Sequence, residues 1–219
     1  MSNKLPQEKK LQIGVLAVQG AFIEHEHILE SLGADVFEIR QLRDLNHPID
    51  GLVLPGGEST VQGKLLRDLG LFEPLKNRIQ EGLPVLATCA GAILLAEKIA
   101  GETKTHFATL PATVRRNAYG RQLGSFFTEN EVTHIGKVPQ TFIRAPYFES
   151  VGNDVEVLSR TATTNKHSNK NPNATTDESN NTTTKQIVAV KYKNQIALSF
   201  HPELNNDTSI HQYFLKLIS

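Results

Sequence analysis

The sequence predicts an α/β fold in which a doubly wound, mostly parallel β-sheet lies between two layers of helices. In the first half of the chain, short apolar segments typical of buried strands alternate with segments whose apolar residues recur at helical spacing. Several strand segments end in turns that contain glycine or proline. Strands and helices that alternate in this way form a parallel sheet with helices on both faces, because right-handed crossovers carry the chain over each face.

The first half of the chain contains the regular part of this pattern. We expect strands at 11–18, 36–39, 52–54 and 85–87, and helices at 22–32, 59–69 and 72–81. Another helix is expected to begin after Cys89, with Ile93, Leu94 and Ala96 starting its apolar stripe. The carboxyl ends of parallel strands lie along one edge of a sheet, so the turns that follow these strands can converge there.

The second half is less regular and is expected to extend the sheet with antiparallel strands. The expected elements are short strands at 112–116, 124–127, 141–145 and 155–159, two strands at 187–190 and 195–200, and a helix at 208–218. Residues 161–186 interrupt this series with Thr, Asn, Lys and Ser and no apolar residue larger than alanine. Such a segment cannot bury enough surface to offset its ordering entropy, so we interpret it as a mobile surface insertion.

Length and composition indicate one soluble, cytoplasmic domain. The 219 residues suffice for a single domain at 11–219, preceded by a polar leader at 1–10 that lacks the apolar core of a signal peptide. The single cysteine cannot form an internal disulfide, which fits a reducing compartment, and no apolar run is long enough to span a membrane. The 23 basic and 23 acidic residues cancel, so neither a nucleic acid nor a membrane surface is an expected partner.

The single cysteine, Cys89, occupies a position suited to nucleophilic catalysis. It follows an apolar strand segment and precedes two small residues, Ala90 and Gly91, at the start of a predicted helix. A sharp strand-to-helix turn raises a side chain above the sheet, and the N-terminus of the helix favours a thiolate. The alternative interpretation is a buried cysteine that packs as a small apolar residue.

His201-Pro202-Glu203, at the end of the last predicted strand, can supply the base that a catalytic thiol requires. His201 would accept the thiol proton and later protonate a leaving amine, while Glu203 would orient the imidazole and stabilise its cation. Pro202 fixes the backbone between these two side chains. Taken alone, this tripeptide is also consistent with an ordinary loop. Together with Cys89 and a Gly-Gly turn at 56–57, it predicts a catalytic triad.

Several motifs, in order along the chain, resemble those of a known family. The segments PGGEST at 55–60, TCAG at 88–91 and SFHPE at 199–203 resemble the class I, triad-type glutamine amidotransferases, whose fold is flavodoxin-like. More narrowly, VQGA at 18–21, RN at 116–117 with GRQ at 120–122, and FIRAP at 142–146 resemble the glutaminase subunit of pyridoxal 5′-phosphate synthase. Ala87 departs from the family, which more often carries glycine two residues before the nucleophile.

This resemblance covers about 11–160 and 186–219, and it implies a reaction and a set of site residues. The Cys89 thiolate would attack the side-chain amide carbon of glutamine, with His201 and Glu203 completing the triad. The backbone N–H groups of Gly57 and Ala90 would bind the resulting oxyanion. The residues implied in substrate binding are Gly57, Glu58, Ser59, Arg116, Ile143 and Arg144. A guanidinium can bind both oxygens of the α-carboxylate of glutamine, although a surface or interdomain ion pair is the alternative for either arginine.

The resemblance also implies a protein partner. The released ammonia would pass to a synthase subunit in a large heteromeric complex, where it becomes the ring nitrogen of pyridoxal phosphate. The chain lacks a Gly-rich phosphate loop of the expected form, so ATP is not implied, and we expect no cofactor. His25 and His27 could suggest a metal ligand pair, but residues two apart on a helix point to different faces. We therefore interpret them as part of a solvated helix face and predict no metal site.

Two other classes of function remain open at this point. One is a free-standing cysteine hydrolase of similar α/β fold, and the other is a catalytically inactive regulatory or scaffold protein. The presence of Cys89, His201 and Glu203 argues against an inactive protein. Release of ammonia from glutamine, measured with and without the synthase subunit, separates the glutaminase from the free-standing hydrolase.

Overall fold

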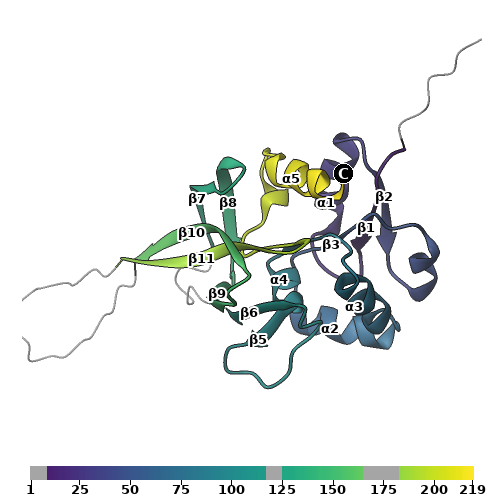
Figure 1. Cartoon of the computed structure of the whole chain (residues 1–219), viewed down its shortest axis with the longest axis horizontal. Coiled ribbons are helices and arrows are strands. Elements are labelled where there is room, and N and C mark those ends of the chain that lie inside the picture. Colours follow the sequence, from purple (N-terminus) through teal and green to yellow (C-terminus); the bar gives the residue numbers. More distant parts are fainter. Residues whose placement is uncertain (1–8, 117–124, 165–182) are drawn as a thin grey trace, which may run out of the picture.

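The computed structural model describes residues 9–116, 125–164 and 183–219, which form a ten-stranded sheet, a separate two-stranded sheet and helices on both faces of the larger sheet (Figure 1). Most of the predicted leader at 1–10 lies outside the described residues, as does the GRQ motif at 120–122. No helix within the described part of the chain is long and apolar enough to cross a membrane.

Half of the large sheet is parallel. Its strands are β1 (Gln12–Leu16), β2 (Asp35–Ile39), β3 (Gly51–Leu54), β4 (Val85–Thr88) and β12 (Gln195–Leu198). They lie in the order β2-β1-β3-β4-β12, and every neighbouring pair is parallel. In this order β1 lies between β2 and β3. Strand β4 lies between β3 and β12, although β12 comes much later in the chain. The predicted doubly wound, mostly parallel architecture is therefore confirmed.

Two apolar cores hold the helices on opposite faces of this sheet. The helices are α1 (Phe22–Ser31), α2 (Ser59–Asp68), α3 (Phe72–Gln80), α4 (Ala90–Leu95) and α5 (Ser209–Ile218), with short 3₁₀ turns η1 (Leu42–Asn46) and η2 (Pro202–Leu204). Helices α1 and α5 lie together on one face, and α2 and α3 lie on the other (Figure 1). Successive residues of β3 alternate between the two cores. Val53 packs into the core on the side of α1 and α5, and Leu52 and Leu54 pack into the core on the opposite face.

The remaining strands extend the sheet beyond β12. They are β5 (Ala96–Ile99), β6 (Leu110–Arg115), β9 (Tyr147–Val151), β10 (Glu156–Thr164) and β11 (Thr183–Tyr192). Strand β11 is antiparallel to β12, β9 and β10, and β9 is antiparallel to β6. Strands β7 (Ser125–Val132) and β8 (Gly136–Ile143) form the separate antiparallel hairpin. The extension is therefore larger than the sequence predicts, and its β5–β6 pair is parallel.

The helix after Cys89 is shorter than predicted, because Ala96 begins a strand and does not continue the helix. All six residues of α4 are buried, so this helix has no polar face. Its last carbonyl groups accept hydrogen bonds from a following loop: Phe107 N–H donates to Leu94 O at 2.9 Å, and Thr109 N–H donates to Leu95 O at 2.9 Å. These tertiary partners replace the next helical turn, and they are not visible in the local sequence pattern.

The prediction of a mobile surface insertion at 161–186 is wrong for both ends of this segment. Strand β10 continues to Thr164 and β11 begins at Thr183, and the two strands pair along this length. Thr161 is 2% exposed, and its hydroxyl oxygen lies 3.2 Å from the side-chain nitrogen of Asn130. Threonine is β-branched and fits a pleated strand, so low apolarity did not exclude regular structure here. The central part of the segment, 165–182, lies outside the described residues.

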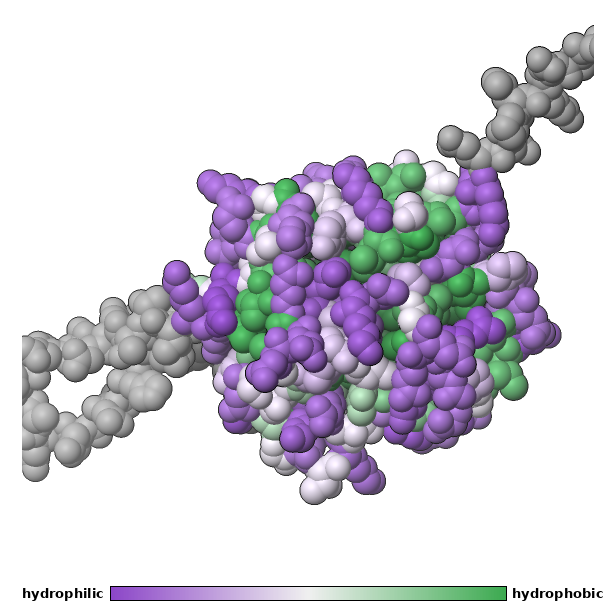
Figure 2. All heavy atoms as spheres, in the orientation of Figure 1, coloured by the Kyte–Doolittle hydropathy of each residue, from purple (hydrophilic) through white to green (hydrophobic). Residues whose placement is uncertain are grey.

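Figure 2 shows that hydrophilic side chains are spread over the face in view, with hydrophobic side chains gathered mainly over α1 and α5. Exposed large apolar side chains also occur away from this area, among them Val61 near the start of α2, Ile143 at the end of β8 and Leu204 in η2. All three belong to elements that begin or end at the carboxyl edge of the parallel sheet.

Candidate active site

The carboxyl ends of β3, β4 and β12 bring three of the predicted motifs together. Gly56 follows β3, Cys89 follows β4 and His201 follows β12. Because β4 lies between β3 and β12 and all three are parallel, these residues leave the sheet at the same edge. The register pairs Thr88 with Leu198, so the nucleophile and the histidine emerge from adjacent strands.

Cys89 lies in a strained turn between β4 and α4. Its φ is 47° and its ψ is −100°, a conformation that residues other than glycine seldom adopt. The turn is held on both sides, because Cys89 N–H donates to Leu198 O at 2.8 Å and Cys89 O accepts from Ile93 N–H at 3.3 Å. A Cβ on Gly91 would lie 2.0 Å from Leu54 O, so only glycine allows the helix to start this close to β3. The turn leaves Cys89 7% exposed at the sheet edge.

His201 and Glu203 form a buried pair beside this turn. His201 Nδ1 lies 2.7 Å from Glu203 Oε1, and the two side chains are 8% and 0% exposed. His201 N–H donates to Thr141 O at 2.8 Å, which ties the segment to β8. The imidazole lies close against the Gly-Gly turn, since a Cβ on Gly56 would approach His201 Cε1 to 2.3 Å. Glycine at this position is therefore required by the close approach of the ring.

The electrostatics of the pair favour an imidazolium. Burial by itself would lower the pKa of His201, but interactions with the Cys89 and Glu203 side chains outweigh burial and raise this pKa to about 10. Burial would raise the pKa of Glu203, yet His25 and His201 keep it below its ordinary value. An imidazolium at neutral pH can pair with a thiolate at Cys89 and hold a proton for a leaving group.

Two backbone N–H groups next to the catalytic turn have no protein acceptor within the described residues. Within the described residues, neither Gly57 N–H nor Ala90 N–H donates a hydrogen bond to the protein. The adjoining carbonyl group of Gly56 accepts from Ala21 N–H at 3.1 Å, which fixes the plane of the Gly56–Gly57 peptide. Gln19 supports the same turn, since its Oε1 atom accepts from Glu58 N–H at 2.8 Å. These supporting contacts were not inferred from the sequence.

A small pocket opens in front of Cys89. Its volume is about 50 Å³, and it is lined by Gly57, Glu58, Ser59, Cys89, Ile93, Arg116, Ile143, Arg144 and Pro146. All six residues that the sequence assigned to substrate binding thus line one pocket with the nucleophile. Ile93 and Pro146 were missed as lining residues, although both lie in segments that the sequence analysis considered. Their apolar side chains give no chemical signal of a site, and only the folded chain places them here.

The pocket carries charges of both signs. Arg144 Nη2 lies 3.4 Å from Glu58 Oε1, and both side chains are exposed. Arg116 Nη1 lies 3.0 Å from Glu102 Oε1 and 3.3 Å from Thr60 Oγ1. An α-amino acid has a carboxylate and an ammonium group, so a pocket with two guanidinium groups and a carboxylate has a partner for each.

The prediction of a solvated helix face at His25 and His27 is wrong for His25. His27 is exposed, whereas His25 is 0% exposed and points into the protein. Its Nε2 atom lies 3.4 Å from Glu203 Oε2, and its Nδ1 atom lies 2.9 Å from Nε2 of the equally buried His211. Sequence reasoning separated the two histidines correctly by face, but it could not tell which element covers the inner face.

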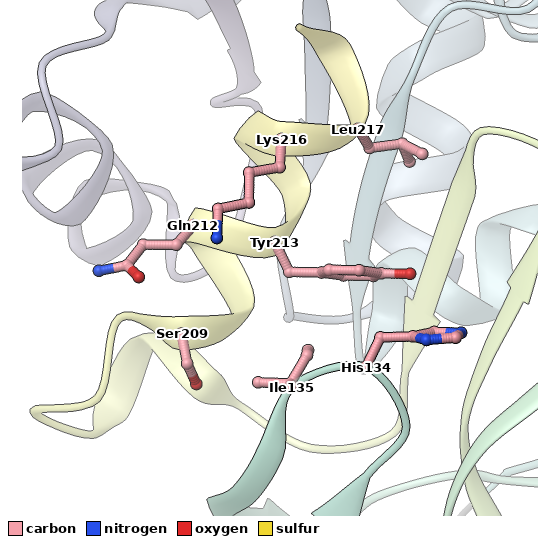
Figure 3. A pocket seen from close by; sticks show the side chains of 7 residues that line it. All are labelled: His134, Ile135, Ser209, Gln212, Tyr213, Lys216 and Leu217. Carbon is pink, nitrogen blue, oxygen red and sulfur yellow. The ribbon is translucent and has the colours of Figure 1, made fainter.

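A larger cavity of about 360 Å³ lies elsewhere, between α5 and the turn of the β7–β8 hairpin (Figure 3). Tyr213 and His134 stack across it, with ring centroids 6.1 Å apart. No member of the predicted triad lines this cavity. The predicted triad therefore points to the smaller pocket at Cys89 as the candidate active site, although the other cavity is larger.

A Cys–His–Glu arrangement at the carboxyl edge of a doubly wound sheet is typical of cysteine-dependent hydrolytic enzymes of α/β fold. The family model of the SNO glutamine amidotransferase family matches residues 15–219. The chain belongs to this family.

Similar proteins cover nearly the whole chain. A relative from Desulfitobacterium hafniense (strain DSM 10664 / DCB-2), named pyridoxal 5′-phosphate synthase subunit PdxT, is 57% identical over 209 residues, which are 95% of this chain and 94% of the relative. A relative of the same name from Streptococcus pneumoniae (strain CGSP14) is 47% identical over 94% of this chain and 97% of its own length. A crystal structure described as a glutamine amidotransferase is 39% identical with a TM-score of 0.79, covering 94% of this chain and 98% of that one.

The contact between Glu203 and His201 predicts how the histidine titrates. We expect the pKa of His201, followed by NMR of its ring nitrogens, to lie near 10, because the Cys89 and Glu203 side chains stabilise the imidazolium. Glu203→Gln should lower this pKa, since the variant keeps a polar side chain but loses the negative charge. Glu149→Gln is the matched control, because Glu149 is exposed and pairs with Arg115. An unchanged His201 pKa in Glu203→Gln would contradict the assigned contact.

Proposed function

We propose that the protein is the glutaminase subunit of a pyridoxal 5′-phosphate synthase, which hydrolyses L-glutamine to L-glutamate and ammonia. The observation that carries this proposal is the pocket that joins Cys89 to Glu58 and two arginines, beside the buried His201–Glu203 pair. The names of the relatives at 57% and 47% identity support the same assignment. These names disfavour a free-standing cysteine hydrolase, because they describe a subunit of a synthase.

The first half of the reaction forms a thioester. The Cys89 thiolate attacks the side-chain amide carbon of glutamine, and the carbonyl oxygen becomes an oxyanion held by Gly57 N–H and Ala90 N–H. Gly57 lines the pocket and Ala90 directly follows Cys89 in the chain, and neither N–H group has a protein acceptor within the described residues. The His201 imidazolium donates its proton to the amide nitrogen as the C–N bond breaks. Ammonia leaves, and a γ-glutamyl thioester remains on Cys89.

The second half releases glutamate. Neutral His201 now removes a proton from a water molecule, which attacks the thioester carbon and forms a second oxyanion in the same hole. Collapse of this intermediate breaks the C–S bond, which restores the thiolate of Cys89 and the imidazolium of His201. Throughout the cycle, Glu203 holds the Nδ1 side of the ring at 2.7 Å, so that Nε2 faces the reacting atoms.

The pocket charges account for the substrate class. We assign the α-carboxylate of glutamine to Arg144 or Arg116 and its α-ammonium to Glu58, because these side chains line the pocket and carry the complementary charges. The backbone at Gly57 and Ser59 borders the same space, and Ile143 supplies an apolar wall. No cofactor or metal has a role in this scheme.

We further propose that the protein acts in the cytoplasm within a large heteromeric complex with the synthase subunit. Exposed apolar side chains support a docking surface around the site: Val61 is 45% exposed, Ile143 is 38% exposed and Leu204 is 43% exposed. Each is next to a catalytic or pocket element, since Leu204 directly follows Glu203 and Val61 lies in the first turn of α2. A partner that covers this edge would receive ammonia where it is made.

The assignment of the nucleophile predicts a complete loss of activity without the thiol. Cys89→Ala should lower the rate of glutamine hydrolysis at least about 10⁴-fold while the fold is retained. The Glu203→Gln variant should keep reduced activity, because His201 is still present as the base and loses only the carboxylate that orients it and stabilises its cation. The measurement is steady-state ammonia release with the synthase subunit present. Substantial activity in folded Cys89→Ala would exclude this mechanism.

The assignment of the arginines predicts a defect in substrate binding. Arg144→Met and Arg116→Met should each raise the KM for glutamine, with the larger effect of about tenfold at the residue that binds the carboxylate. Arg115→Met is the matched control, since Arg115 neighbours Arg116 but pairs with Glu149 and does not line the pocket. If neither variant changes KM more than the control does, the carboxylate is bound elsewhere.

The docking surface predicts that activity depends on the partner. We expect the isolated chain to hydrolyse glutamine slowly and the synthase subunit to raise kcat by about 10²–10³, the value of one correctly placed oxyanion donor. Val61→Asp should weaken the partner's effect, so that more synthase subunit is needed for half-maximal rate. Leu69→Asp is the control, because Leu69 is 38% exposed at the opposite end of α2. A rate already maximal without partner would contradict this dependence.

A further inference from the structure

A chain of buried polar side chains continues beyond the triad. Glu203 Oε1 contacts His201, and Glu203 Oε2, on the other side of the carboxylate, lies 3.4 Å from His25 Nε2. His25 Nδ1 in turn lies 2.9 Å from His211 Nε2. His25 comes from α1 and His211 from α5, and both are 0% exposed. The mechanism described above uses neither histidine.

The position of one proton decides what this pair does. A single hydrogen bond joins His25 Nδ1 and His211 Nε2, so one of these nitrogens donates and the other accepts. If His25 Nδ1 donated, neutral His25 would turn an unprotonated Nε2 toward the Glu203 carboxylate. If His211 Nε2 donates, neutral His25 instead carries its proton on Nε2. Only the second arrangement directs an N–H toward the carboxylate.

Burial makes this second arrangement the favourable one. Glu203 Oε2 is buried and makes no hydrogen bond within the described residues, and His25 Nε2 lies 3.4 Å from it, so a proton on this nitrogen brings an N–H group near an oxygen that lacks a donor there. His25 Nε2 also lies 3.3 Å from the Thr88 hydroxyl, next to Cys89 in the chain. In this arrangement His211 Nδ1, which has no hydrogen-bond partner in the described part of the chain, is an unprotonated acceptor, and no unpaired N–H is buried there.

We propose that His25 is a positioning residue for the glutaminase reaction, which holds the second oxygen of Glu203, and that His211 sets the ring tautomer of His25. This inference rests on the proposed function. The carboxylate is then fixed by one histidine on each oxygen and cannot rotate away from His201. The arrangement repeats, one step further from the substrate, the way in which Glu203 itself orients His201.

The charged groups around His25 are consistent with a neutral ring. Burial lowers the pKa of His25, and His201 lowers it further, whereas the carboxylates of Glu203 and Glu24 raise it; the net direction is downward. The pKa of His211 lies well below its ordinary value, because the ring is buried and faces His25. When both rings are neutral, the hydrogen bond from His211 can fix the tautomer of His25 without adding a positive charge beside the His201 imidazolium.

The experiment compares three variants in the complex with the synthase subunit. His25→Leu removes the donor, and we expect kcat for glutamine to fall about 10- to 100-fold at an unchanged KM, because His25 does not line the pocket. His25→Gln replaces the ring N–H with an amide N–H, and it should recover most of kcat. His27→Leu is the matched control on the same helix, since His27 is exposed, and it should leave kcat unchanged.

A second measurement separates positioning from packing. The pKa of His201, followed by NMR in the full chain, should fall in His25→Leu, because an unheld Glu203 stabilises the imidazolium less well, and it should return in His25→Gln. A loss of stability alone would lower the melting temperature without moving this pKa. If His25→Leu does not fold, His211→Leu decides by the same criteria, because it leaves His25 in place and removes only the tautomer selection.

Each outcome has one meaning. A folded His25→Leu, or in its place a folded His211→Leu, with unchanged kcat and an unchanged His201 pKa overturns the inference. So does a loss of kcat that His25→Gln does not recover and that leaves the His201 pKa in place. If the unsubstituted complex releases no ammonia from glutamine, the proposed function fails, while the His201 pKa comparison still tests whether His25 holds Glu203.

Discussion

The pairing of β4 with β12 is the contact on which the active site depends. These strands come from distant parts of the sequence, yet their register places Thr88 opposite Leu198 and ties Cys89 N–H to the Leu198 carbonyl group. A shift of one residue would turn every side chain of β12 to the other face of the sheet. Nucleophile and base would then leave the sheet on different faces. Because both strands are fully buried, the two apolar cores prevent such a shift.

Next to the β4–β12 pair the protein buries the charged side chain of Glu203. Glu203 loses its hydration on folding, a cost that must be offset by donors inside the protein. His201 contacts one of its oxygens at 2.7 Å, and His25 approaches the other at 3.4 Å. In the arrangement that we propose, the carboxylate has a histidine on each side, and its fixed orientation is passed to the imidazole of His201. Helices α1 and α5 therefore do more than cover one face of the sheet, since their buried histidines lie behind the triad.

The antiparallel half of the protein contributes one wall of the pocket and one hydrogen bond to the triad, from His201 N–H to Thr141 O of β8. The hairpin of β7 and β8 ends at Ile143, and Arg144 follows with a φ of 44°, which turns the chain sharply at the pocket. Strand β6 ends just before Arg116 on another side. The pocket is thus lined from both halves of the fold, because Glu58 follows β3 of the parallel half and Arg144 follows β8 of the hairpin.

Much of this protein was determined by its sequence alone. Apolar strands, helical stripes and glycine turns fixed the parallel half of the sheet, and Cys89, His201 and Glu203 stand in local motifs whose chemistry is readable without a structure. The local pattern failed where tertiary partners decide. Ala96 starts a strand because a distant loop binds the carbonyl groups of α4, and Thr161 is buried because β10 pairs with β11. His25 shows the same limit: helical periodicity separates it from His27, but only the packing of α1 beside Glu203 makes it an inner residue, because burial depends on what the rest of the chain brings to that face.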